Sequence, residues 1–302
     1  MVLRDRWQAF DIASVAVLSF VLYKGARDPA LEYSRNLLLS ALFLLAVFLL
    51  LPRVVFGSAY ADMRLAPFML ALAVIAVRPK PGLSIRHAAT LAAVGFAFFL
   101  VRIGGTTASY YYYDQTVTQT LRALDHIPQG ARLVSFVGRR CPDTWGYSRL
   151  EHIPGLALER KEAYSNDQWS MPGAQLLTAH YAMAGHFAHD PSQIVTDEWC
   201  RGEWWWPITT SLSRLPRDAF DYVWLIHPPA YPAKYNAGLV EIWHDGPNRL
   251  YRIDHAKRGP DVPDAEIMPP WYHPRPAGTE SASPGTPGLI PPTPARAPDN
   301  RR

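Results

Sequence analysis

The chain lacks the common signatures of enzyme active sites. It has no Gly-rich phosphate loop, no G-x-S-x-G nucleophile elbow and no H-E-x-x-H zinc motif. The sequence therefore displays no complete catalytic site, and it implies no cofactor. The formal net charge is only +4, and the Lys and Arg residues are scattered or flank apolar runs. Because a nucleic-acid surface needs a basic face with interleaved stacking groups, nucleic acid is not expected as a partner.

The start of the chain also lacks the pattern of a signal peptide. Asp5 and Asp11 interrupt the charged and apolar segments, and no small-residue cleavage site follows. One weak apolar run precedes a strong one, which is compatible with the C-terminal part of a longer polytopic protein.

Cysteine is scarce, since Cys141 and Cys200 are the only two. A single pair is compatible with a disulfide, but only in an oxidising compartment.

Long apolar runs dominate residues 1–109. They lie at 12–23, 36–56, 59–77 and 88–108. The first run is short of the roughly 20 residues that span a bilayer, and extending it back to Trp7 takes in Asp11, so an interfacial or re-entrant helix is its alternative. The four tyrosines at 110–113 mark the point where the chain leaves the lipid. We therefore predict a region of about four transmembrane helices.

Basic residues in the short loops predict the orientation of this region. The loops at 24–35 and 78–87 contain six basic residues, and the opposite side contains four. The six are Lys24, Arg27, Arg35, Arg78, Lys80 and Arg86; the four are Arg4, Arg6, Arg53 and Arg64. The bias places the first two loops in the cytoplasm and everything after residue 113 outside. The expected location is therefore a multi-pass position in a membrane, with membrane lipid as a partner.

Residues 110–256 are expected to form a small extracytoplasmic α/β domain. A helical spacing over 114–126 precedes an apolar strand at 132–137, and a second strong strand lies at 220–226. Segments 239–243 and 249–253 flank an Asp-Gly turn, which is a hairpin signal. Weaker features are strands at 156–158 and 175–181 and a short helix at 211–215. The tail at 257–302 contains twelve of the 28 prolines and is predicted to be disordered.

Two polar groups are candidates for chemistry. Asp62 and Arg64 lie at a membrane boundary, where they are candidates for contacting a lipid-linked pyrophosphate or an ion. The simpler interpretation is a helix start, with Asp at the positive N-terminus and Arg extending to the interface. The stretch from His180 to Asp190 also contains His186 and His189. Because zinc usually needs three or four converging ligands, surface turns explain these histidines better than a metal site does, and no metal is predicted.

An aromatic cluster lies beside the second cysteine. Trp204, Trp205 and Trp206 are consecutive, and Trp199 precedes Cys200. Indole rings stack on sugars and partition to lipid interfaces, so the three consecutive tryptophans are candidates for sugar or interface contacts. The alternative is a local aromatic core held by a Cys141–Cys200 disulfide.

The pattern of residues 34–255 resembles the C-terminal part of bacterial polytopic membrane proteins of the GT-C glycosyltransferase-like kind. The resemblance rests on several stretches: GSAYADMRLAPFMLAL, ALDHIPQGARLVSFV, AYSNDQW, FDYVWLI and GLVEIWHDGPNRLYRI. It implies a membrane-helix bundle with an outer domain, and transfer of a sugar from a polyprenyl-phosphate carrier. Those enzymes carry catalytic acidic residues in their first outer loop. Here only Asp5 and Asp11 precede the first crossing, so no catalytic residue is transferred.

Three functional hypotheses follow. The first is a GT-C-like protein, complete or truncated, that acts on polyprenyl-linked sugars at the outer face of the bacterial inner membrane. The second is a non-catalytic, membrane-anchored module that binds a glycan or a protein, or that serves in assembly. The third is a metal-dependent enzyme built on the histidines of the outer domain.

Overall fold

The computed structural model describes residues 6–52, 54–55, 58–59, 63–141, 145, 149–168, 178–188, 190–201 and 203–260. The chain divides into two compact units. The first unit comprises Met1–Thr116 and Thr144–Tyr147, and the second comprises Val117–Asp143 and Ser148–Arg302. Of the tail predicted to be disordered, all but residues 257–260 lie outside the described residues.

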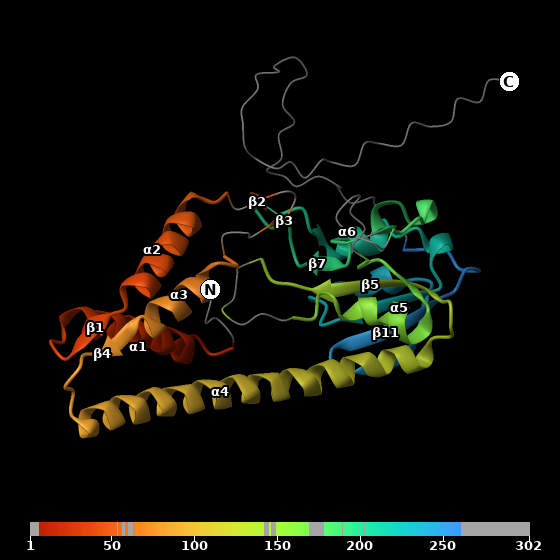
Figure 1. Ribbon diagram of the computed structural model, residues 1–302. Coiled ribbons are helices and arrows are strands. Elements are labelled where there is room, and N and C mark those ends of the chain that lie inside the picture. The colour runs from red at the N-terminus through yellow and green to blue at the C-terminus, as the bar shows by residue number, and fades with distance from the viewer. Residues whose placement is uncertain are drawn as a thin grey trace, which may run out of the picture. The chain divides into compact units, whose positions relative to one another are not determined.

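The first unit contains four helices and short strand pairs (Figure 1). The helices are α1 (Gln8–Arg27), α2 (Arg35–Leu50), α3 (Ala66–Ile75) and α4 (Ile85–Leu121). The strands are β1 (Leu31–Tyr33), β2 (Val54–Val55), β3 (Ser58–Ala59) and β4 (Val77–Pro79). Strand β1 pairs with β4, and β2 pairs with β3, both in antiparallel fashion.

The prediction of a four-helix membrane region followed by a small domain is wrong. By length and composition, only two of the described helices are candidates for crossing a membrane: α1, and the helical stretch Ile85–His126 that contains α4. Helix α2 has 16 residues and α3 has 10. At 1.5 Å per residue they extend about 24 and about 15 Å, short of a hydrocarbon core of about 30 Å.

Prolines account for the shortening of both middle helices. Helix α2 ends before Pro52, because a proline pushes the preceding residue out of the helical region; Leu51 has φ −72° and ψ 129°. Helix α3 begins beside Pro67, whose missing N–H is tolerated only in a first turn. The end of the predicted third crossing is not helical either, since Val77 belongs to β4.

A buried ion pair holds α1 to α4 within the first unit. Asp11 is almost completely buried, and its Oδ1 lies 2.7 Å from Nη1 of Arg102. The same Nη1 lies 3.3 Å from the Ser14 hydroxyl, and the Trp145 indole donates to Asp11 Oδ2 at 2.8 Å. The Asp11 carboxylate, which interrupts the first apolar run, thus has an ion-pair partner in Arg102 and a hydrogen-bond donor in Trp145.

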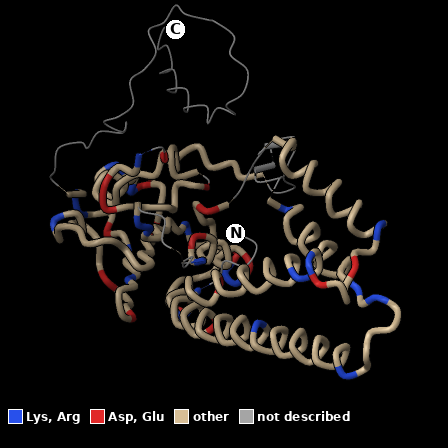
Figure 2. The backbone as a smooth tube through the Cα atoms, turned by 90° about the vertical axis from the view of Figure 1, so that its left-hand side faces the viewer, with Lys and Arg blue, Asp and Glu red and all other residues tan. Residues whose placement is uncertain are grey.

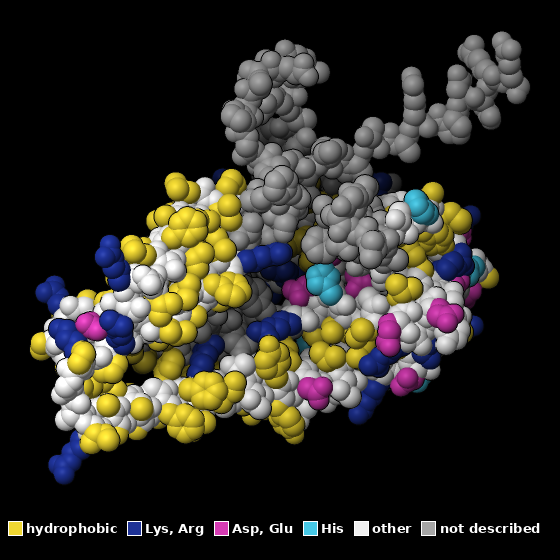
Figure 3. Space-filling model, viewed as in Figure 1, with side chains coloured by type: hydrophobic (Ala, Val, Ile, Leu, Met, Phe, Trp, Pro, Cys, Tyr) yellow, Lys and Arg dark blue, Asp and Glu magenta, His cyan; other side chains and the backbone are white. Residues whose placement is uncertain are grey.

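The helices also approach closely beside this pair. A Cβ at Gly105 of α4 would lie 2.8 Å from the ring of Phe10, so any larger residue there would displace that ring. The described residues that are buried in the first unit are otherwise small or polar. They are Ser14, Gly25, Ala41, Ala66, Ala76 and Ser109. Large apolar side chains of α2 and α4 instead face outward (Figure 3).

The second unit is built on a seven-stranded mixed sheet (Figure 1). Its strands are β5 (Arg132–Gly138), β6 (Tyr164–Ser165), β7 (Ile194–Thr196), β8 (Trp206–Pro207), β9 (Tyr222–Ile226), β10 (Leu239–Asp245) and β11 (Asn248–Ile253). The order is β10-β11-β9-β5-β7-β8, and β6 also pairs with β5. Strands β5 to β9 are parallel, whereas β10 and β11 form an antiparallel hairpin beside β9.

Short helices cover the sheet. They are α5 (Leu156–Lys161) and α6 (Ile208–Ser213), with 3-10 turns η1 (Arg122–His126), η2 (Ile153–Gly155), η3 (Ala182–Ala188), η4 (Arg217–Ala219) and η5 (Ala233–Asn236). Alternate residues of the central strands face opposite sides. Val134 and Leu225 pack into a core with α6, while Leu133 and Trp224 pack into a second core with α5 and η1. Because both faces are covered, the central strands read as continuous apolar runs.

The strongest predicted strands are confirmed. The structure places β5 and β9 at the two apolar runs, and β10 and β11 form the expected hairpin around the Asp-Gly turn. The strand at 156–158 is wrong, because this segment is the start of α5; Leu, Ala, Glu, Arg and Lys are all good helix formers. The strand at 175–181 is wrong at 178–181, which has no regular structure, and its first three residues lie outside the described residues.

Candidate functional site

The order of the strands defines a switch point beside β5. The chain passes from β5 to β6, β7 and β8 on one side of that strand, and then returns to β9 on its other side. In open α/β sheets, ligands bind at the carboxyl ends of the strands that flank such a reversal. In this chain those ends are Gly138 and Arg139 of β5 and its continuation, and His227 after β9.

The backbones of β5 and β9 come unusually close at this edge. A Cβ at Gly138 would lie 2.0 Å from the carbonyl oxygen of His227, so only glycine fits. His227 has φ +44°, in the left-handed region, and its backbone N–H donates to Oδ1 of the buried Asn248 at 3.0 Å. Partial burial of the ring lowers the pKa of His227, which keeps the imidazole neutral near pH 7 although the residue retains an exposed face.

Arg139 is the centre of a charged and aromatic cluster at the end of β5. Its backbone N–H donates to the carbonyl of Val195, which fixes the residue beside β7. Its Nη1 lies 3.4 Å from Oε1 of Glu151, and its Cζ lies 4.5 Å from the ring centroid of Trp205. Glu203 remains exposed, and its partial desolvation raises its pKa, while the nearby Arg139 opposes that shift. We call Arg139, Glu151, Glu203 and Trp205 the Arg139 cluster.

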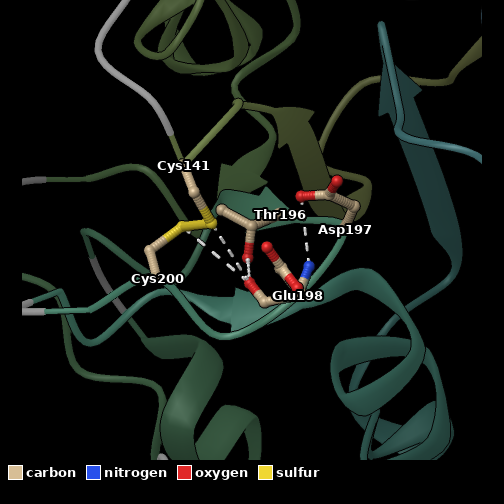
Figure 4. Close-up of a disulfide and its surroundings, with 5 residues drawn as sticks. All are labelled: Cys141, Thr196, Asp197, Glu198 and Cys200. Carbon is tan, nitrogen blue, oxygen red and sulfur yellow. Dashed lines mark hydrogen bonds between the residues drawn. A yellow bond between two sulfur atoms is a disulfide. The ribbon is translucent and has the colours of Figure 1, made fainter.

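The predicted disulfide is confirmed and supports this cluster. Cys141 follows Arg139 by two residues, and its sulfur is bonded to that of Cys200, 59 residues further along (Figure 4). Both sulfurs lie near the carbonyl oxygen of Glu198, which also accepts a hydrogen bond of 2.7 Å from Thr196. The disulfide therefore attaches the segment that carries Trp205 to the end of β5.

The three consecutive tryptophans are separated by the fold. Trp206 belongs to β8, packs against the core and stacks on His186, with ring centroids 3.8 Å apart. Trp205 instead lies against Arg139, and Trp204 and Trp205 are both partly buried, as Trp206 is. The aromatic-core alternative therefore describes Trp206, and the position of Trp205 leaves it suited to contact a ligand.

The other candidates from the sequence do not come together. Arg64 is exposed in the turn before α3, and Asp62 lies outside the described residues, as does His189. His180 is exposed, the carboxylate of Asp190 accepts a hydrogen bond of 2.5 Å from Nε2 of Gln193, and His186 stacks on Trp206. Within the described part of the chain, no group of three His, Cys, Asp or Glu residues is arranged to hold a metal ion.

A second polar cluster lies between β6 and β7. The Asn166 side chain accepts from the N–H of Ser135 at 2.7 Å and donates to its carbonyl at 3.1 Å, so it takes the place of a strand residue beside β5. The neighbouring Asp167 is buried, and Ser165 donates to its Oδ1 at 2.9 Å. Burial raises the pKa of Asp167 to about 6, against the opposing effects of Ser165 and of nearby His152.

Sequence reasoning missed Arg139, Glu151, Glu203 and His227. His227 directly follows the predicted strand at 220–226, and Arg139 lies two residues after the predicted strand at 132–137; these positions were the available signal. The pairing of those two strands was not predicted, and neither was the position of β7 and β8 across β5. Only the strand order shows that these residues, which are distant in the sequence, lie at the same edge of the sheet.

No family model matches the chain. Searches of curated proteins and of solved structures also gave no match. The resemblance to GT-C proteins therefore stays a prediction, and nothing in these comparisons indicates such an origin.

Proposed function

We propose that this protein is a membrane-anchored, non-catalytic module that binds a glycan at the carboxyl edge of its sheet. The observation that carries the binding proposal is the Arg139 cluster. The partly exposed indole ring of Trp205 supplies a flat apolar face for a sugar, while a guanidinium and two carboxylates supply donors and acceptors for its hydroxyl groups. The cluster lies at the switch point, where the sheets of α/β proteins present their ligands.

The side chains of the Arg139 cluster are already held in place before a ligand binds, so binding would cost little conformational entropy. The disulfide holds the Trp205 segment, and β7 holds Arg139 through a backbone hydrogen bond. Arg139 already contacts the indole ring and Glu151 in the free protein. Preorganised groups of this kind favour affinity because little conformational entropy is lost on binding.

The distribution of apolar side chains supports the membrane anchor. The most apolar part of α4 has no buried residue within the structure, and large side chains such as Phe96 and Phe99 are exposed. A bilayer is the solvent in which such a surface is favourable, and α1 and α4 are long enough to enter it. The disulfide favours an oxidising space for the second unit, which agrees with the orientation that the basic loops predict.

The glycan proposal is tested with the full chain in lipid nanodiscs. Soluble neutral and uronic-acid-containing oligosaccharides are titrated while tryptophan fluorescence is recorded. We expect saturable binding by the wild type and a loss of at least about tenfold in affinity for Trp205→Ala, since sugar stacking requires that ring. Trp7→Ala, which removes an exposed indole of the first unit, is the matched control and should bind like the wild type.

Two results would contradict the glycan proposal. One is the absence of saturable binding across both classes of oligosaccharide. The other is equal affinity of the wild type and Trp205→Ala.

The orientation of the protein in the membrane has its own test, in which whole cells are mildly reduced and treated with a membrane-impermeant thiol reagent. Cys141, which is partly exposed, should then be labelled from outside, and labelling only after the membrane is opened would reverse the orientation.

A further inference from the structure

Backbone pairing brings two basic loops together at one end of the first unit. Strand β1 lies in the loop after α1, and β4 lies in the segment after α3. They pair antiparallel in the register Leu31↔Pro79 to Tyr33↔Val77. Two more backbone bonds extend the pairing, from the N–H of Lys80 to the carbonyl of Ala30 and from Ser34 to Ala76. The two loops therefore form one surface, which we call the basic end.

The basic end carries a charge surplus equal to that of the whole protein. Residues 24–35 and 78–87 contain six Lys or Arg and two Asp or Glu, which leaves a surplus of four positive charges. The complete chain has a formal net charge of +4, so its other residues are neutral in sum. Figure 2 shows these cations at the end of the helices where the two loops lie. A field of one sign at one place is suited to an anionic partner.

Only part of this charge is used inside the protein. Lys24 lies 3.5 Å from Asp28, and Arg78 lies 2.8 Å from Glu32. The remaining cations are exposed, and within the described residues they enter no ion pair. They are Arg27, Arg35, Lys80 and Arg86. The two carboxylates thus neutralise two cations and leave four directed to the surroundings.

Apolar side chains border the basic end on the helices that leave it. Phe20 and Tyr23 of α1, and Ile85 and Leu91 of α4, are exposed large side chains. Cations next to an exposed apolar helix surface match the headgroup layer of a bilayer, where phosphate lies directly above the acyl chains. A protein partner would have to meet both features, whereas a phospholipid combines them in one molecule.

We propose that the basic end binds the headgroups of anionic phospholipids in the membrane that α1 and α4 enter. This inference rests on the membrane anchoring proposed above, and it is independent of glycan binding. The exposed guanidinium and ammonium groups contact lipid phosphates, and the β1–β4 pairing fixes their spacing. The occupant is a lipid of the same leaflet, and the interaction weakens with salt because the cations are exposed.

The experiment measures which lipids remain on the full-length protein. The protein is reconstituted in bilayers with equal amounts of phosphatidylglycerol and phosphatidylcholine, extracted in mild detergent, and analysed by native mass spectrometry. We expect the wild type to retain several times more phosphatidylglycerol than phosphatidylcholine. The double variant Arg35→Gln/Lys80→Gln should lose at least about threefold of this preference. The matched control Arg252→Gln/Arg258→Gln removes two exposed charges of the second unit and should behave like the wild type.

Different failures have different meanings. Equal retention of the two lipids by the wild type overturns the inference, and so does an equal loss of preference in both double variants. Release of the protein from bilayers by alkaline carbonate overturns the inference together with the membrane anchoring. Loss of oligosaccharide binding by Trp205→Ala in a protein that shows no lipid preference would leave the glycan proposal standing and end this one.

Discussion

The two units of this protein bury opposite kinds of side chain. In the second unit the most buried large residues are aromatic and aliphatic, with Phe136, Phe220 and Trp224 inaccessible to solvent. In the first unit the described residues with the least exposure include Asp11 and Ser109, while Phe43 and Leu50 are 66% and 82% exposed. In both units apolar surface avoids water. The two patterns agree with this rule if the second unit is surrounded by water and the helices of the first unit are surrounded by lipid.

The surroundings of an ion pair also change how much it stabilises each unit. The Asp11–Arg102 pair is surrounded by apolar helices and has further partners in Ser14 and Trp145. In the second unit Arg132 pairs with Asp221 at a partly exposed site, which lowers the pKa of Asp221. Exposed pairs contribute little because water competes for both charges.

The first prediction applies one substitution to both units. Phe136→Ala removes a fully buried ring from the core of the second unit, and it should lower the free energy of unfolding by about 4 kcal/mol. Phe96→Ala removes a ring that is 60% exposed on α4 and should change stability by less than about 1 kcal/mol. Denaturant unfolding of the full chain in detergent, followed by near-UV circular dichroism, measures both. Similar losses would remove the contrast between the units.

The second prediction concerns the buried ion pair. Asp11→Ala leaves Arg102 buried without its counter-charge, and should destabilise the first unit by about 3 kcal/mol. The double variant Asp11→Leu/Arg102→Leu removes both charges and should recover most of that loss, since an apolar pair suits the same surroundings. Thermal unfolding in detergent measures the difference. A double variant that is less stable than the single one would show that the pair itself stabilises the helices.

The third prediction uses pH to examine the buried carboxyl of the second unit. The pKa of Asp167 is about 6 in the folded protein and near 3.8 when unfolded, with His152 and Asp190 as its charged neighbours. The folded state therefore binds the proton more tightly. Stability should be greatest below pH 4 and fall between pH 4 and 6, by about 2 to 3 kcal/mol, and then stay constant as far as this group is concerned.

The variant Asp167→Asn isolates that effect. It cannot ionise, so it should be more stable than the wild type above pH 6 and similar to it near pH 4. Urea unfolding at pH 4.5 and at pH 7.5 measures the difference. Asp197→Asn, an exposed carboxyl beside the disulfide, is the control and should alter neither value. A wild-type protein whose stability rises through this range would contradict the assignment to Asp167.

The sequence predicted the second unit better than the first, for physical reasons. A strand buried on both faces is an uninterrupted apolar run, so β5 and β9 are visible without any knowledge of their partners. Apolar runs predict helix length less well. Pro52 and Pro67 end or start a helix at single positions, although the residues around them remain apolar. The composition of those runs therefore overstated the number of helices that could cross a membrane.

The candidate site depended on pairing that no local pattern encodes. The disulfide was predictable because the chain has one pair of cysteines, and Trp205 was visible as part of an aromatic cluster. Arg139 and Glu151 were not, because they meet only after β7 has paired with β5. The order of parallel strands is fixed by contacts between distant segments, and short windows of sequence do not contain it.

The smallest effect is expected where the second unit contains a polar group without a partner. The Nε1 of Trp224 is buried, and within the described residues it has no hydrogen-bond acceptor, in contrast to the several partners of Asp11. Trp224→Phe removes this unsatisfied donor and also some packing, so the two effects should cancel to within about 1 kcal/mol. Trp224→Ala removes the packing as a whole and should cost about 4 kcal/mol. Denaturant unfolding compares the two variants, and equal losses would mean that the indole N–H forms a stabilising contact in the native protein.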